Sequence, residues 1–176
     1  MKSFASSLAI TCALVTSAHA QPAPVAPAPA ANTIGVDGMV VIPVGDYADA
    51  TTLAIGPLLR IEIPAGPGFV TGRIGALYHL TEIDDTTLIF FPIYGGFRYP
   101  LGSGAAYLAG ELGLTIGYLR ADTPLGSGSD TETELGMTLG GGLRKGQLDL
   151  RAGLFLPDLG DAVGLFGSVG FDFASF

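Results

Sequence analysis

Cysteine, tryptophan and charged residues are scarce or missing in this sequence. Cys12 is the single cysteine, there is no tryptophan, and charged residues make up 14% of the chain. A lone cysteine excludes an intramolecular disulfide and a site built from several thiolates. The formal net charge of -8 argues against nucleic acid as a partner, because proteins bind phosphate backbones through basic patches.

Long hydrophobic runs are also missing, although the chain is apolar overall. Apolar residues make up 48% of it, and the mean hydropathy is +0.50. After Val36, the longest stretch without Asp, Glu, Lys or Arg has twelve residues, fewer than the roughly 18 that a transmembrane helix needs. High hydropathy without long runs is typical of a transmembrane β-barrel, in which apolar residues occupy alternate positions.

The first 20 residues are predicted to be a signal peptide that is cleaved after export. Lys2 supplies a positive charge, residues 4–15 are a short apolar segment, and Ala18-His19-Ala20 matches a small-x-small cleavage site. A lipoprotein site at Cys12 is the alternative, but the residues before it resemble a lipobox only weakly. Residues 21–32, rich in proline and alanine, are predicted to be an extended linker.

From residue 33 to residue 176, the chain divides into eight segments in which polar and apolar residues alternate. A period of two is typical of strands with one apolar face, and most segments have the length of a tilted strand that crosses a bilayer. The predicted strands are residues 34–44, 52–63, 69–80, 88–99, 105–120, 135–144, 147–156 and 163–173. The predicted fold class is therefore all-β, an eight-stranded antiparallel up-and-down transmembrane β-barrel.

The connections between these strands alternate in length and in charge. The links after the second, fourth and sixth strands are short, as periplasmic turns are, and the other four are longer on average. The longer links contain no Lys or Arg, and they carry eleven of the sixteen acidic residues: Asp46, Asp49, Glu82, Asp84, Asp85, Asp122, Asp130, Glu132, Glu134, Asp158 and Asp161. We expect an acidic outer end and a periplasmic end that holds both termini.

The remaining acids share the polar face of the strands with five arginines. The ten residues are Asp37, Arg60, Glu62, Arg73, Arg98, Glu111, Arg144, Asp149, Arg151 and Asp172. An eight-stranded barrel is just wide enough for its side chains to fill the interior, and isolated charges there would be costly. These residues are predicted to form an ion-pair network that plugs the lumen, and a narrow porin-like transport pore is the alternative.

The chain resembles the small outer-membrane β-barrel proteins of the OmpA-like and OmpX-like type over residues 34–176. The resemblance rests on two features. The stretch Pro43-Val44-Gly45-Asp46-Tyr47-Ala48-Asp49 is similar to the first strand-to-loop junction of such proteins, and the terminal Phe176 is similar to their assembly signal. The resemblance implies the outer membrane of a Gram-negative bacterium, contact with its lipid and lipopolysaccharide, and the barrel-assembly machinery as a partner during biogenesis. A closed barrel has no open edge, so we expect a monomer.

The aromatic residues bear on this interpretation in two ways. Phe171 and Phe173 have the opposite parity to Phe176, which predicts either a β-bulge near Ala174-Ser175 or an atypical assembly signal. We expect interfacial girdles on the lipid face, at the periplasmic and outer ends of the barrel; their members are Phe97, Tyr99, Phe171, Phe173, Tyr78 and Tyr118. The core of a soluble sandwich is the alternative, because it also buries one parity.

Catalytic and metal sites have only weak support. Some eight-stranded barrels modify lipid A with a histidine, and His79 has as conceivable partners Ser127, Ser129, Ser168, Glu82 and Asp84. The local Ser and His pattern of those enzymes is missing, so we interpret His79 as structural. The alternating acids of the outer loops favour a solvated rim, or weak Ca²⁺ or Mg²⁺ bridging to lipopolysaccharide phosphates.

No catalytic, cofactor-binding or metal-ligating residue is therefore predicted. The predicted function is that of a non-enzymatic barrel with a structural or surface-interaction role, whose specificity lies in its acidic outer loops and whose extracellular ligand is open. A transport pore and a lipid A-modifying enzyme are the alternatives.

Overall fold

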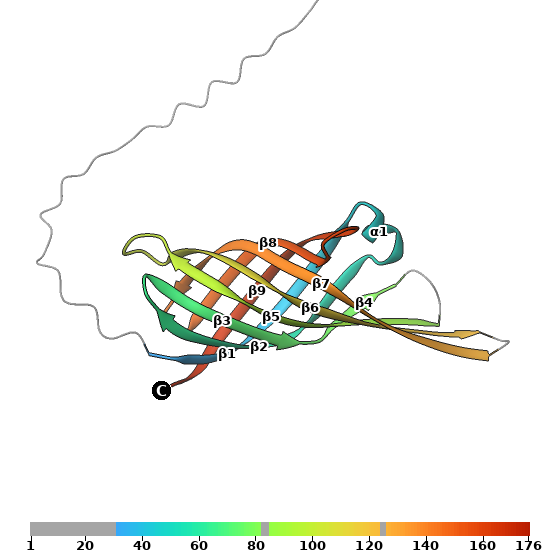
Figure 1. The fold of residues 1–176 in the computed structure, drawn as a ribbon, viewed down its shortest axis with the longest axis horizontal. Coiled ribbons are helices and arrows are strands. Elements are labelled where there is room, and N and C mark those ends of the chain that lie inside the picture. The colour runs from blue at the N-terminus through green and yellow to red at the C-terminus, as the bar shows by residue number, and fades with distance from the viewer. Residues whose placement is uncertain (1–30, 82–84, 124–125) are drawn as a thin grey trace, which may run out of the picture.

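The computed structural model describes residues 31–81, 85–123 and 126–176, which form a closed β-barrel (Figure 1). The predicted signal peptide and nearly all of the predicted linker lie outside the described residues. No helix in the described part of the chain is long and apolar enough to cross a membrane.

The described residues form nine strands and one short helix, and every pair of neighbouring strands is antiparallel. In chain order they are β1 Thr33–Val44, α1 Asp46–Ala50, β2 Leu53–Ala65, β3 Gly68–Gly75, β4 Leu77–Leu80, β5 Thr86–Pro100, β6 Ala106–Thr123, β7 Gly126–Lys145, β8 Leu148–Asp158 and β9 Ala162–Ser175. Pairing of β1 with both β2 and β9 closes the sheet.

Strands β3 and β4 are two parts of one barrel strand. Both pair with β2 and β5, and the register is the same on either side of the break at Ala76. Pro57 on β2 and Pro92 on β5 flank the break, and a proline has no N–H with which to continue a ladder. The predicted eight-stranded antiparallel barrel is therefore confirmed.

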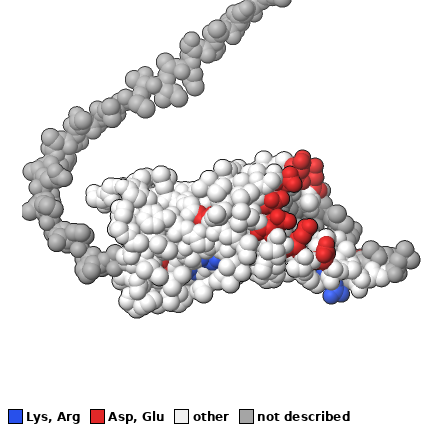
Figure 2. All heavy atoms as spheres, viewed as in Figure 1, with Lys and Arg blue, Asp and Glu red and all other residues white. Residues whose placement is uncertain are grey.

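The outer surface of the barrel is apolar, because the alternation along each strand directs its large apolar side chains outward. Leu108, Leu150 and Val169 are 55%, 51% and 59% exposed, and similar residues occur on the other strands. Figure 2 shows a flank mostly free of charged atoms, with the acidic side chains gathered at the end that carries α1. This pattern is the reverse of a water-soluble protein, whose exposed patches of apolar surface are small.

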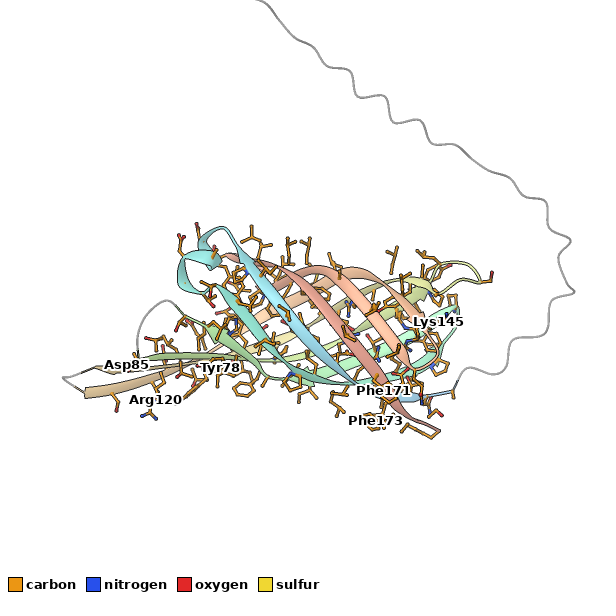
Figure 3. The ribbon with its side chains drawn as sticks, turned by 180° about the vertical axis from the view of Figure 1, so that it is seen from behind. Tyr78, Asp85, Arg120, Lys145, Phe171 and Phe173 are labelled. Atoms are coloured by element: carbon orange, nitrogen blue, oxygen red, sulfur yellow. The ribbon has the colours of Figure 1, made fainter. Side chains whose placement is uncertain are left out.

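The two ends of the barrel differ in construction. Phe171, Phe173 and Lys145 lie at the end where the described chain begins and ends, and Tyr78, Asp85 and Arg120 lie toward the other end (Figure 3). Asn32 and Phe176 exchange backbone hydrogen bonds of 3.2 and 3.1 Å, which fixes the two ends of the domain side by side. We call the opposite end, with α1, the acidic end.

The last strand carries a bulge, as one of the two sequence-based interpretations predicted. Ile34 pairs with Ala174 and Gly35 with Asp172, which leaves Phe173 as the extra residue. The bulge is one residue earlier than expected, and a bulge of this kind changes the parity of the residues that follow it.

The predicted loop 121–134 is wrong in most of its length. Strands β6 and β7 pair without a break from Ala106 opposite Leu143 to Thr123 opposite Gly126, and this hairpin projects beyond the other strands (Figure 1). Residues 126–134 are small, polar or acidic on both faces. They carry no apolar alternation because neither face of the projecting hairpin is covered, and the sequence pattern therefore suggested a loop.

Two glycines provide a matched test of how closely the strands approach. A Cβ added at Gly153 would lie 2.0 Å from the carbonyl oxygen of Leu139, whereas one added at Gly167 would have no atom within 4 Å. We predict that Gly153→Ala lowers the free energy of unfolding by about 1–3 kcal/mol, a typical cost of overpacking. Gly167→Ala should leave it unchanged or slightly raised, and equal urea midpoints for the two variants would contradict the strand spacing.

Candidate functional site

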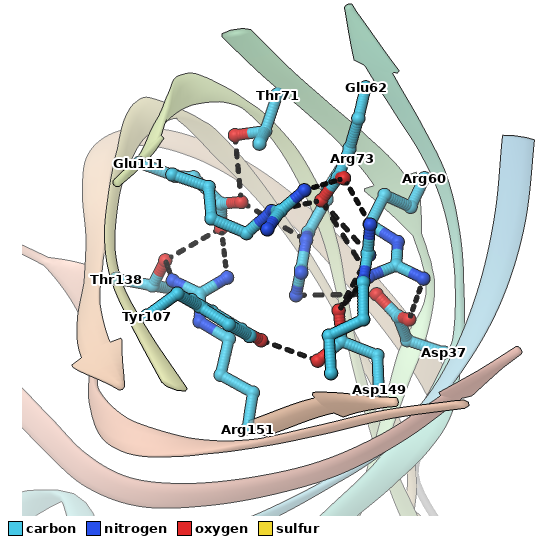
Figure 4. A network of polar contacts seen from close by, with 12 residues as sticks. Asp37, Arg60, Glu62, Thr71, Arg73, Tyr107, Glu111, Thr138, Asp149 and Arg151 are labelled. Carbon is cyan, nitrogen blue, oxygen red and sulfur yellow. Dashed lines mark hydrogen bonds and ion pairs between the residues drawn. The ribbon is translucent and has the colours of Figure 1, made fainter. Parts of the chain in front are cut away.

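Charged side chains from every strand except β4 meet inside the barrel (Figure 4). The pairing of Thr33 with Glu62 and of Gly35 with Asp172 places them in the half nearer the termini. They are the ten predicted from the sequence: Asp37, Arg60, Glu62, Arg73, Arg98, Glu111, Arg144, Asp149, Arg151 and Asp172. Each takes part in at least one ion pair, and side-chain exposure does not exceed 14%, the value for Arg144. We call this set the internal ion network.

Arg60 lies at the centre of the larger part of the network. Its guanidinium pairs with Asp149, with Asp172 at 2.7 Å and with Asp37 at 3.5 Å, and Glu62 lies 3.7 Å away. The Arg60 side chain is fully buried. Because one cation neutralises parts of several carboxylates, removing it would leave those carboxylates without their partner in a dry interior.

Glu62 is held by two further arginines, which close the network toward the termini. Arg98 donates two hydrogen bonds to it, of 2.9 and 3.2 Å, and Arg144 donates two more, of 2.6 and 3.2 Å. The Arg98 guanidinium also lies 4.0 Å from the centre of the Phe69 ring. Charge-assisted, two-pronged contacts of this kind fix both the position and the orientation of a guanidinium.

Glu111 is the centre of the second part, deeper in the barrel. It pairs with Arg73 at 3.0 Å and with Arg151 at 2.8 Å, and it accepts hydrogen bonds from Thr71 and Thr138. Asp37 joins the two parts, because it pairs with Arg73 at 3.3 Å as well as with Arg60. The network therefore continues across the interior.

Three neutral members of this site were missed from the sequence. Tyr107 donates its hydroxyl to Asp149, and Thr71 and Thr138 donate to Glu111. All three lie on the inward parity of their strands beside the charged residues. That parity was the available signal, because a carboxylate buried among inward-facing residues needs hydrogen-bond donors.

The half of the interior nearer the acidic end is apolar, which the sequence-based picture of a polar lumen did not anticipate. The buried cluster there consists of Met39, Val41, Tyr47, Ala54, Leu58, Leu77, Tyr94, Phe155 and Phe166. Between the cluster and the ion network lies a cavity of about 10 Å³, roughly the room that one water needs. The ion network and the apolar cluster thus lie on either side of this small cavity.

Helix α1 covers the apolar half at the mouth of the barrel. Tyr47 on α1 is 7% exposed and stacks on Phe90, and its hydroxyl lies 2.5 Å from Nε2 of His79. Nδ1 of His79 lies 3.2 Å from the carbonyl oxygen of Leu77. Because a carbonyl can only accept, Nδ1 carries the ring proton and Nε2 of the neutral ring accepts from the Tyr47 hydroxyl, whose pKa is raised by burial.

These contacts bear on the enzyme hypothesis for His79. The side chain is 0% exposed, and both ring nitrogens are engaged, with Tyr47 and with Leu77. Its contacts are those of a structural residue that fastens α1 to the barrel wall. Of the conceivable partners, Ser127 and Ser129 lie on the projecting hairpin and Ser168 on β9, while Glu82 and Asp84 lie outside the described residues.

Eight acidic residues of the predicted outer loops are described with their side chains. They are Asp46 and Asp49 on α1, Asp85 before β5, Asp130, Glu132 and Glu134 on β7, Asp158 at the end of β8, and Asp161 before β9. Within the described ranges, no three His, Cys, Asp or Glu side chains are placed so that they could hold a metal ion.

The six aromatic residues predicted to be interfacial lie on the outward parity of their strands. Their exposed fractions are 44% for Tyr78, 37% for Phe97, 48% for Tyr99, 44% for Phe171 and 55% for Phe173, and Tyr118 is half-buried. Phe171 and Phe173 lie near the termini and Tyr78 lies toward the acidic end (Figure 3).

We predict that Arg60→Met lowers the free energy of unfolding by about 3–5 kcal/mol, because it strands buried carboxylates that now share a cation. Lys145→Ala, at an exposed turn outside the network, should change it by less than about 0.5 kcal/mol. Urea titration of the detergent-solubilised barrel measures both. Equal stability of the two variants would show that Arg60 is dispensable to the network.

The fold is that of known outer-membrane β-barrels. No protein-family model matches the chain, and a search of curated proteins found no match either. Ail, the attachment invasion locus protein of Yersinia pestis, is similar in structure with a TM-score of 0.58 at 17% identity, over 81% of this chain and 95% of that one.

Two further solved structures agree with this comparison. Ail in complex with the heparin analogue sucrose octasulfate has a TM-score of 0.58 at 18% identity, over 81% of this chain and 95% of that one. The N-terminal β-barrel domain of Pseudomonas aeruginosa OprF has a TM-score of 0.58 at 8% identity, over 80% of this chain and 97% of that one. At such identities the likeness establishes the fold alone: this chain is built as a small eight-stranded barrel of the outer-membrane type.

Proposed function

We propose that this protein is a non-enzymatic barrel of the outer membrane of a Gram-negative bacterium, and that it acts through its acidic end. The observation that carries the proposal is the division of its surface. The flank is apolar around the barrel, whereas the acidic side chains gather at one end (Figure 2). An apolar band flanked by polar ends is the surface that a bilayer requires of a barrel.

The construction of the two ends supports one orientation. The termini and the short turns after β2, β5 and β7 lie at one end, and α1, the projecting hairpin and the acids lie at the other. Short turns face the periplasm in barrels of this type and longer connections face outward. The acidic end is therefore the outer surface.

The closed interior supports an interaction role over a transport role. The internal ion network lies in the half nearer the termini, the apolar cluster lies in the other half, and α1 packs on that cluster through Tyr47. A water-filled pore needs a continuous polar path, and the apolar cluster interrupts it. The network is thus a plug, and partners bind at the outer end.

The partners follow from the surface. The apolar flank contacts membrane lipid, and the outer rim contacts lipopolysaccharide. Removal of residues 1–20 by signal peptidase and folding by the barrel-assembly machinery belong to the same proposal, as does a monomeric state, because the barrel wall closes on itself.

A polyanion is a poor candidate for the outer ligand. The Ail structure that holds a heparin analogue shows that a barrel of this fold can hold a highly charged anion. Here, the acidic end carries eight described carboxylates, and like charges repel such a ligand. The electrostatics favour a cationic partner.

Membrane location is tested by fractionation and by gel mobility. We predict that the protein is recovered with outer membranes and that unboiled and boiled samples migrate differently in detergent gels, because the closed ladder resists unfolding without heat. Recovery from the soluble periplasmic fraction, with no mobility difference, would contradict the proposal.

The closed interior predicts the electrical behaviour. Purified protein in planar bilayers should show no steady open conductance, because buried ion pairs and apolar side chains fill the lumen. A stable open channel at neutral pH would replace the interaction role with the transport alternative.

A further inference from the structure

The wall of the barrel ends unevenly at the outer surface. Strand β7 pairs with β6 from Gly126 to Leu143, but with β8 only from Met137 to Lys145. Within the described ranges, residues 127–134 therefore have a ladder partner on one side alone. The opposite edge is open beside the turn between β8 and β9.

Two hydrogen bonds show which backbone groups face this open edge. The carbonyl of Leu135 accepts from the N–H of Leu159, and the N–H of Thr131 donates to its neighbour Asp130. Leu159 belongs to the turn between β8 and β9, so the Leu135 carbonyl points away from β6, and the Thr131 N–H is bonded to a side chain of its own strand. Because the direction alternates along an antiparallel strand, the backbone groups of Ser129, Thr131 and Thr133 face the edge.

A pocket of about 430 Å³ adjoins this edge on the inner face of the hairpin. Its floor is apolar, formed by Leu88, Phe90, Leu119, Pro157 and Ala162. Five carboxylates surround the floor, and the lining contains no Lys or Arg: the acids are Asp130, Glu132, Glu134, Asp158 and Asp161. Ligand pockets in proteins have about this size and this mixture of an apolar surface with a few polar groups.

We propose that this edge and pocket together bind an extended, basic peptide segment of another protein by strand addition. The inference rests on the proposed function, since it takes the acidic end to face outward. A peptide strand beside β7 would pair with the backbone of Ser129, Thr131 and Thr133. Every second side chain would then enter the pocket, as in other cases of strand addition.

Lysine and arginine side chains suit the pocket because each has an apolar stem and a charged end. Their methylene stems cover apolar surface while the charged group stays in water or meets an acid. Glu132 lies opposite Gly117 on β6, so the space beside that carboxylate is not occupied by a cross-strand side chain. The stem can lie over Leu119 and Phe90 while the cation reaches Glu132 or Asp161.

Acidic residues on an open edge have a competing explanation. Charges on edge strands can serve to prevent pairing with other chains. The two explanations differ in sign: removing the acids weakens binding of a basic strand if they attract it, and promotes strand association if they only repel.

The probe is a fluorescent eight-residue peptide that alternates lysine and threonine, titrated against the full protein in detergent micelles at low ionic strength. We expect the double variant Glu132→Gln/Glu134→Gln to weaken binding about tenfold, from two charge contacts. The matched control Asp46→Asn/Asp49→Asn, on α1 at the same end but outside the pocket, should change it less than about twofold.

The backbone contribution is tested separately from the charge. Thr131→Pro removes an N–H that faces the edge without touching the ladder to β6, so it should weaken binding at least about fivefold, whereas Thr131→Val keeps the N–H and should bind normally. A peptide with N-methylated amides should bind weakly for the same reason. Equal binding of that peptide would show attraction by charge alone and overturn strand addition.

Other results also decide the question. Failure of the wild-type protein to bind the peptide, or tighter association of the Glu132→Gln/Glu134→Gln variant, would overturn the inference. The gel-mobility and fractionation assays are run on the same samples. A protein that passes them without binding the peptide retains the proposed function and loses only this partner.

Discussion

The constraint on which the rest of this molecule depends is neutralisation of charge inside a closed ring of strands. Five guanidinium groups and five carboxylates are held inside the barrel with at most 14% of each side chain exposed, so each lies beside an opposite charge. Closure of the barrel makes this possible, because it brings Arg60 to Asp172, a residue 112 positions away along the chain. The pairs in turn fix the strands that carry them.

The interior is divided along the barrel axis, and the division has consequences for function. The ion network lies toward the termini and the apolar cluster toward the acidic end, where α1 seals it through Tyr47 and His79. Buried ions provide orientation and apolar packing provides stability, so the barrel is a rigid support. Side chains at the outer end are free of the core, which suits them to contact a partner.

The uneven wall links the fold to the proposed partner. Strand β7 begins at Gly126, eleven residues before Met137, which is its first residue that pairs with β8. A barrel normally removes its sheet edges, and this one restores an edge outside its closed part. The open edge follows from that difference in strand length, and the apolar floor and the five acids lie beside it.

Alternation of side chains determined the strand count, the closed architecture and the identity of the ten inward charges, because a period of two assigns each residue to a face whatever its partners are. It also suggested, as one of two interpretations, a bulge near Ala174-Ser175, and the structure has one at Phe173. Alternation did not distinguish a charged half of the interior from an apolar half, and it did not identify Tyr107 as a donor to Asp149. The reason is that inward parity gives neither a residue's position along the barrel axis nor the side chain that it contacts. The projecting hairpin was missed since its faces are both uncovered and carry no pattern.

Only the tertiary structure decided which carboxylate pairs with which guanidinium and where the barrel wall ends, because both depend on the register between strands that are distant in sequence.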